Sequence, residues 1–148
     1  MVNAVTAARD RGIEIVESRS SRPRHFTSLV SVKLQTSGGE RWVEGTVFEP
    51  GTPRLVSVRG VGVEAPLGGT MLILTNDDRP GVIGDVGTIL GRHGVNIANF
   101  ALGRSDTGAI GVVNVDEDAT SATALEPAVH EIRRLPAIRD AWVIRLQP

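Results

Sequence analysis

The chain lacks several residue types that whole classes of function depend on. It has no cysteine among 148 residues, which excludes disulfides, zinc–thiolate sites and thiol nucleophiles. His25, His93 and His130 are too far apart for a short-spaced zinc helix, so no metal site is predicted. Aromatic residues make up 3% of the chain and tyrosine is absent. The net charge of −1 gives no general attraction to nucleic acid or to a membrane surface.

Long apolar runs are also missing. No stretch approaches 18 apolar residues, so we expect no transmembrane helix, and the N-terminus does not have the pattern of a signal peptide. These two absences predict a cytoplasmic protein. What remains is an ordinary globular composition, with 41% hydrophobic and 22% charged residues.

The best internal boundary is Pro-Leu-Gly-Gly-Thr at residues 66–70, because Pro and paired Gly favour a turn. Residues 1–69 carry a net charge of +2 and residues 70–148 a net charge of −3. We therefore predict two small domains, 1–69 and 70–148. Each is short enough to gain stability from a partner surface.

Residues 1–69 predict a small, mostly antiparallel α+β unit. A short helix is expected over Asn3–Asp10, followed by strand-like alternation. A hairpin turn is expected at Ser37–Glu40. The expected strands cover Ile13–Glu17, Thr27–Leu34, Arg41–Phe48, Arg54–Val58 and Val61–Glu64.

Residues 70–148 predict the order βαββαβ of the ferredoxin-like fold. Strands are expected at 71–75, 95–102, 109–115 and 139–146, with helices following the first and third of them. Gly84, Gly87 and Gly91 in the first helix suggest close approach to a neighbouring sheet or helix, since each weakens a helix by roughly 1 kcal/mol.

The loop after the first of these strands, residues 76–81, has the strongest chemical signal. Pro80 suits a helix start, and Asp78 is placed to cap that helix. The free N–H groups of Gly81, Val82 and Ile83 would attract a carboxylate, while Asp78 could attract an ammonium group. The loop could thus match both charges of an amino acid, or Asp78 could be only a cap.

Three further features of the sequence bear on function. Arg19–His25 is the one basic cluster and could hold a phosphate or contact nucleic acid, or simply be a solvated loop. Asn96 could be only a turn residue. Asp116–Asp118 does not match a calcium loop, because the sixth and twelfth positions are Ser121 and Pro127.

Three segments of the second half resemble the ACT regulatory domain of the D-3-phosphoglycerate dehydrogenase family. They are Asp78–Gly84, Gly94–Ala98 and Gly103-Arg104. Val2–Ala4, Arg11–Ile13, Gly45-Thr46 and Pro53-Arg54 resemble the intervening domain of its longer members. The resemblance extends over essentially the whole chain. It implies a regulatory fragment of an NAD-dependent dehydrogenase of serine synthesis, without catalytic residues or a cofactor of its own.

The resemblance also implies a ligand and a partner. L-serine, or a similar small amino acid, would bind between the ACT domains of a homodimer or higher oligomer. The implied effector residues are Asn76, Asp78, Pro80, Gly81, Val82, Ile83 and Asn96. A candidate anion site of the intervening domain would use Arg54 and Arg59. The alternatives are an oligomerisation module without a ligand, or the regulatory part of a serine dehydratase-like or other amino-acid-sensing protein.

Overall fold

The computed structural model describes residues 3–20, 26–48, 51–116 and 119–146. Its first half is a four-stranded antiparallel sheet in which neighbouring strands follow one another along the chain, in the order β1-β2-β3-β4. The elements of this half are α1 (Ala4–Asp10), β1 (Val30–Thr36), β2 (Gly39–Phe48), β3 (Thr52–Val58) and β4 (Val61–Pro66).

The second half has the expected βαββαβ order. Its strands form an antiparallel sheet in the order β6-β7-β5-β8, which confirms the ferredoxin-like, α+β prediction. The elements are β5 (Gly69–Asn76), α2 (Val82–Arg92), β6 (Ile97–Ser105), β7 (Gly108–Val115), α3 (Ala119–Ile132) and β8 (Ile138–Leu146).

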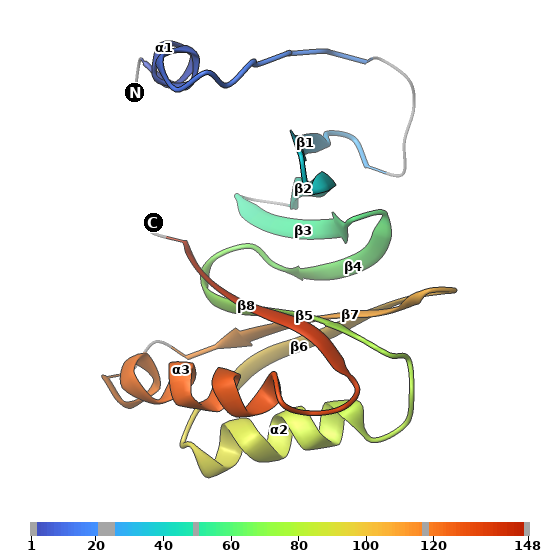
Figure 1. Cartoon of the computed structure of the whole chain (residues 1–148), viewed down its shortest axis with the longest axis vertical. Helices are drawn as coiled ribbons and strands as arrows, with labels where there is room; N and C mark the ends of the chain where they lie inside the picture. The colour runs from blue at the N-terminus through green and yellow to red at the C-terminus, as the bar shows by residue number, and fades with distance from the viewer. Residues whose placement is uncertain (1–2, 21–25, 49–50, 117–118, 147–148) are drawn as a thin grey trace.

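The layers are stacked as first sheet, second sheet and helices (Figure 1). Helices α2 and α3 cover one face of the second sheet, while β3 and β4 cover the opposite face. This arrangement follows from alternation along β5. Leu72 and Leu74 point into the core under the helices, whereas Met71 and Ile73 point toward the first sheet. A strand buried on both faces is apolar along its buried stretch, as β5 is from Met71 to Leu74.

The link between the halves is short and held in place. β4 ends at Pro66 and β5 begins at Gly69. The side-chain amide of Asn114, which is buried on β7, donates to the carbonyl oxygen of Pro66 at 3.1 Å. The two halves also share an apolar core, formed by Leu55, Val58, Val63, Ala65, Met71, Ile73, Ile110 and Val112. They therefore pack against one another rather than being joined by a free hinge.

The start of the chain is much less covered. Helix α1 has no buried residue, every residue of β1 is exposed, and residues 13–20 form no regular element. The strand predicted at Ile13–Glu17 is therefore wrong, because alternating residues form a strand only when a neighbouring strand pairs with them. Val30, Val32 and Leu34 leave more than half of their surface exposed. No helix within the described ranges is long and apolar enough to cross a membrane.

Candidate functional site

The loop between β5 and α2 is fixed by hydrogen bonds at its first residues. Asn76, the last residue of β5, is buried, and its Nδ2 donates to the carbonyl oxygen of Asp77 at 2.8 Å. The N–H of Asp77 donates to the carbonyl oxygen of Ala137 at 2.9 Å, and the N–H of Arg79 donates to that of Asp77 at 3.0 Å. The loop therefore leaves the sheet in a defined direction.

Asp77 is the best-anchored acid of this loop, although the sequence did not single it out. Its carboxylate accepts from Arg139 Nε at 2.9 Å and from Arg139 Nη2 at 2.8 Å, and Arg79 lies 3.3 Å away. Arg139 also donates to the carbonyl oxygen of Thr107 at 2.6 Å. The start of β8 thus joins this loop to the β6–β7 turn. In the sequence, only the ferredoxin-like order of strands could have suggested the contact between Arg139 and Asp77.

Asp78 does not cap the helix. Its two carboxylate oxygens accept from Arg104 Nε, on β6, at 3.0 and 2.9 Å. The helix begins at Val82, its N-cap is Gly81, and no side chain forms a cap hydrogen bond. Pro80 therefore precedes the helix instead of starting it. The prediction that Asp78 caps the helix is wrong because Asp78 lies three residues before the N-cap, Gly81.

The helix N-terminus is open toward solvent. Gly81 has φ +93°, a left-handed conformation that glycine adopts without strain. The first hydrogen bond of the helix runs from the N–H of Asp85 to the carbonyl oxygen of Gly81, at 2.9 Å. The N–H groups of Val82, Ile83 and the residue after them have no intrahelical partner, as at any helix start. Ile83 is 46% exposed beside them.

Asn96 lies at the other end of the helix. It precedes β6, and its Nδ2 donates to a carboxylate oxygen of Asp116. The N–H of Asp116 donates back to the carbonyl oxygen of Asn96 at 3.1 Å. Helix α2 has 11 residues and so spans about 16 Å. Within one chain, Asn96 and Asp78 are therefore separated by roughly the length of that helix.

The two arginines of the candidate anion site are also held apart. Arg54 lies near the start of β3, where its Nη2 is 3.0 Å from Glu64, and its buried Nε has no partner in the described part of the chain. Arg59 follows the end of β3, in the turn to β4. A strand of this length separates their Cα atoms by well over 10 Å.

Other candidates contribute less. Arg19 pairs with Glu17 at 3.2 Å, and residues 21–25 of the predicted basic cluster lie outside the described residues. Among the residues that are described, no group of three His, Cys, Asp or Glu side chains could hold a metal ion. A Cβ added at Gly84, Gly87 or Gly91 would meet no atom of this chain within 4 Å. The close approach to a neighbouring sheet or helix that the sequence suggested is therefore wrong within this chain.

Comparison with known proteins matches the two parts of the chain to two different family models. Residues 1–59 match the family model for the D-3-phosphoglycerate dehydrogenase intervening domain, and residues 70–133 match the ACT domain model. D-3-phosphoglycerate dehydrogenases from Archaeoglobus fulgidus, Bacillus subtilis and Synechocystis sp. are 33%, 31% and 29% identical to it. Each match covers at least 98% of this chain, but the chain spans only about a quarter of those relatives.

Proposed function

Because the chain belongs to the regulatory region of D-3-phosphoglycerate dehydrogenases, with their intervening domain and an ACT domain, we propose that it binds L-serine as an effector. The ligand lies at the start of α2, between two copies of the chain. The chain itself carries no catalysis. The catalytic and NAD-binding parts belong to the remainder of the parent enzyme, whose dehydrogenase activity falls when serine is bound.

The observation that carries this proposal is the placement of opposite partial charges around one loop. The open N–H groups at the start of α2 attract the ligand carboxylate, and the positive end of the helix dipole adds to that attraction. The Asp78 carboxylate, three residues before the N-cap, attracts the ligand ammonium group. Arg104 uses one nitrogen on that carboxylate, which can accept about four hydrogen bonds and so retains capacity for the ammonium.

A second copy is needed to complete the site. Asn96 and Asp78 lie at opposite ends of α2, so a two-fold axis that places two α2 helices antiparallel would bring Asn96 of one chain to Asp78 of the other. Two features favour this pairing. β6 is an edge strand of the second sheet, so its outer edge has no paired strand among the described residues. The outer face of α2 carries the small exposed residues Gly84, Thr88 and Gly91.

Calorimetry with L-serine, D-serine and glycine tests the proposal, alongside sedimentation to measure the dimer. We expect L-serine to bind the dimer, and Asp78→Asn to weaken binding at least tenfold. The loss of a charge-assisted hydrogen bond costs about 1.5–3 kcal/mol, and 1.4 kcal/mol is a factor of ten. The matched control is Asp85→Asn, which removes an exposed acid from the first turn of α2.

The alternatives give different results. A dimer that binds none of the three amino acids is the result expected of an oligomerisation module and would overturn the effector site. Equal binding of L-serine by Asp78→Asn and by the unchanged chain would exclude Asp78 as the ammonium partner. Preference for another amino acid would point to a different member of the amino-acid-sensing proteins.

A further inference from the structure

The edge strand β6 has opposite charges near its two ends. Arg104 is the last residue but one of β6. Asp116 lies beside the start of the same strand, because Ile97 pairs with Val115 on β7. The stretch between these ends, Ile97–Gly103, carries no charged residue. A strand of this length spans about 20 Å, so Arg104 and Asp116 of one chain lie too far apart to form an ion pair.

Arg104 uses only part of its hydrogen-bonding capacity within the chain. Its Nε donates to both carboxylate oxygens of Asp78, at 3.0 and 2.9 Å. The two terminal nitrogens carry four of the five N–H donors of a guanidinium group, and neither donates to a residue in the described ranges. The Arg104 side chain is also 69% exposed. It therefore presents unused donors outside the edge of β6.

Asp116 is incompletely paired as well. It is exposed, and its carboxylate accepts a hydrogen bond from Asn96 Nδ2, which is a neutral donor. Its own N–H donates to the carbonyl oxygen of Asn96 at 3.1 Å, which fixes it beside the start of β6. No basic side chain forms an ion pair with Asp116 in the part of the chain that the structure describes. Its negative charge is therefore left uncompensated.

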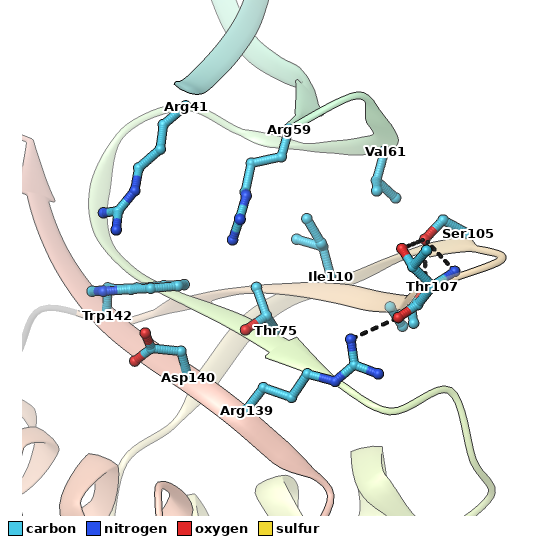
Figure 2. Close-up of a pocket in the computed structure, with 12 residues that line it drawn as sticks. Arg41, Arg59, Val61, Thr75, Ser105, Thr107, Ile110, Arg139, Asp140 and Trp142 are labelled. Atoms are coloured by element: carbon cyan, nitrogen blue, oxygen red, sulfur yellow. Dashed lines mark hydrogen bonds between the residues drawn. The ribbon is translucent and has the colours of Figure 1, made fainter. Parts of the chain in front are cut away.

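The end of β6 that carries Arg104 is fixed in direction. Phe100 packs against the core under the helices, and strand alternation places Leu102 and Arg104 on the same face as Phe100. Just beyond the strand, Arg139 donates to the carbonyl oxygen of Thr107 in the β6–β7 turn at 2.6 Å (Figure 2). Arg104 thus lies on the helix side of the sheet edge, next to the effector loop.

Two copies of this strand complement one another. A two-fold axis across the middle of β6 pairs the outer edges of two β6 strands antiparallel. The end of each strand then meets the start of the other, so that Arg104 of one chain faces Asp116 of its partner. Leu102, on the same face as Arg104, is 37% exposed, and pairing of two copies removes it from water.

We propose that Arg104 of one chain forms an ion pair with Asp116 of the other, and that this pair holds the effector site together. The proposal rests on the pairing of two copies in the proposed function. Asn96 brings Asp116 with it toward Asp78 of the other chain, because Asn96 and Asp116 are hydrogen-bonded. Arg104 then joins the acids of both chains, with Nε on Asp78 and the terminal nitrogens on the partner's Asp116. Arg104 is therefore a positioning residue for Asp78, the partner of the ligand ammonium group.

Sedimentation of two charge-reversed variants tests this ion pair. In Arg104→Glu and in Asp116→Arg, both contacts of the symmetric dimer join like charges, so each variant should raise the Kd of dimerisation at least roughly tenfold. In an equimolar mixture, a dimer of one chain of each kind has opposite charges at both contacts. Mixing should therefore restore dimerisation to near that of the unchanged chain. The defects within each chain persist in the mixture, so restoration reports a contact between chains.

Arg145→Glu is the matched control. Arg145 lies on β8, the opposite edge strand of the same sheet, and pairs with Glu126 at 3.2 Å. The same charge reversal there should leave dimerisation unchanged. Arg104→Gln and Asp116→Asn add a second test that introduces no repulsion. Their double variant should dimerise no more weakly than the weaker single variant, because either substitution already removes the pair.

The outcomes separate this proposal from the proposed function. A mixture that stays as dissociated as its two components, or losses that add up in the double variant, would overturn the ion pair. Calorimetry with L-serine is measured alongside. A chain whose dimer is restored by mixing but that binds no L-serine would refute the effector site and support the ion pair. A chain that binds L-serine but is not restored by mixing would overturn the ion pair alone.

Discussion

Gly103→Ala should separate the two sheets, because β4 passes directly over β6 at this residue. A Cβ at Gly103 would lie 2.3 Å from the carbonyl oxygen of Gly62, and 3.0 Å from side-chain atoms of Val61 and Val63. Ordinary contact begins near 3.4 Å, so the backbone of β4 would have to retreat by about 1 Å. Val63 is buried in the core between the sheets and would move with it.

The cost follows from that displacement. Overpacking a well-packed core typically costs about 1–3 kcal/mol, and here the obstacle is backbone, which cannot rotate away. We expect a loss near the upper end, roughly 2–3 kcal/mol. With a urea dependence of about 2 kcal/mol per molar, the unfolding midpoint should fall by about 1 M or more.

Gly62→Ala is the matched control, since it adds the same methyl group to the opposite strand at the same crossing. A Cβ on Gly62 meets nothing within 4 Å, so this variant should unfold close to the unchanged chain. Urea denaturation followed by far-UV circular dichroism compares all three proteins. If Gly103→Ala unfolds at the same urea concentration as Gly62→Ala, the close packing of the two sheets would be refuted.

Two further predictions concern the helices. Gly84→Ala and Gly87→Ala should each raise the free energy of unfolding by about 0.5–1 kcal/mol, because nothing in the chain lies within 4 Å of the added methyl group. Urea denaturation of dilute protein measures this change, and a loss of stability in either variant would contradict the prediction. Weaker dimerisation of the variants in sedimentation would instead support pairing of two chains through α2. The hydrogen bond from His93, 3.0 Å away, is the main cause that lowers the pKa of Glu131. Glu131→Gln should therefore destabilise the fold at pH 7, and the difference should shrink as the pH falls below about 4.5; a difference that is constant with pH would exclude the carboxylate charge as its cause.

Most of the secondary structure could be predicted from local pattern. The ends of the elements shifted by a few residues, but the βαββαβ order was recovered, because alternation and helical spacing are properties of neighbouring residues. The strand expected at Ile13–Glu17 was wrong because pairing with a distant strand is not a property of neighbouring residues. Its alternation is real, but a strand needs a partner, and the sequence of a segment does not say whether one is available.

The sequence likewise predicts one part of the candidate site but not the other. Residues 76–83 could be identified from the sequence, because a polar turn, a proline and a glycine before an apolar helix stand next to one another. The partners of its acids could not, since Arg104 lies 26 residues from Asp78 and Arg139 lies 62 residues from Asp77. Those pairs depend on which strands are neighbours in the sheet.

The sequence by itself therefore determined the elements, the ferredoxin-like second half and the loop whose charges suit an amino acid. Each of these depends on interactions between residues a few positions apart. Tertiary structure decided that Asp78 pairs with Arg104 instead of capping the helix, and that Asn96 is a helix length away from it. It also brought Arg41 of the first sheet over the ring of Trp142 in the second sheet (Figure 2). Packing of distant strands fixes such contacts, because burial of the shared apolar core determines which surfaces meet.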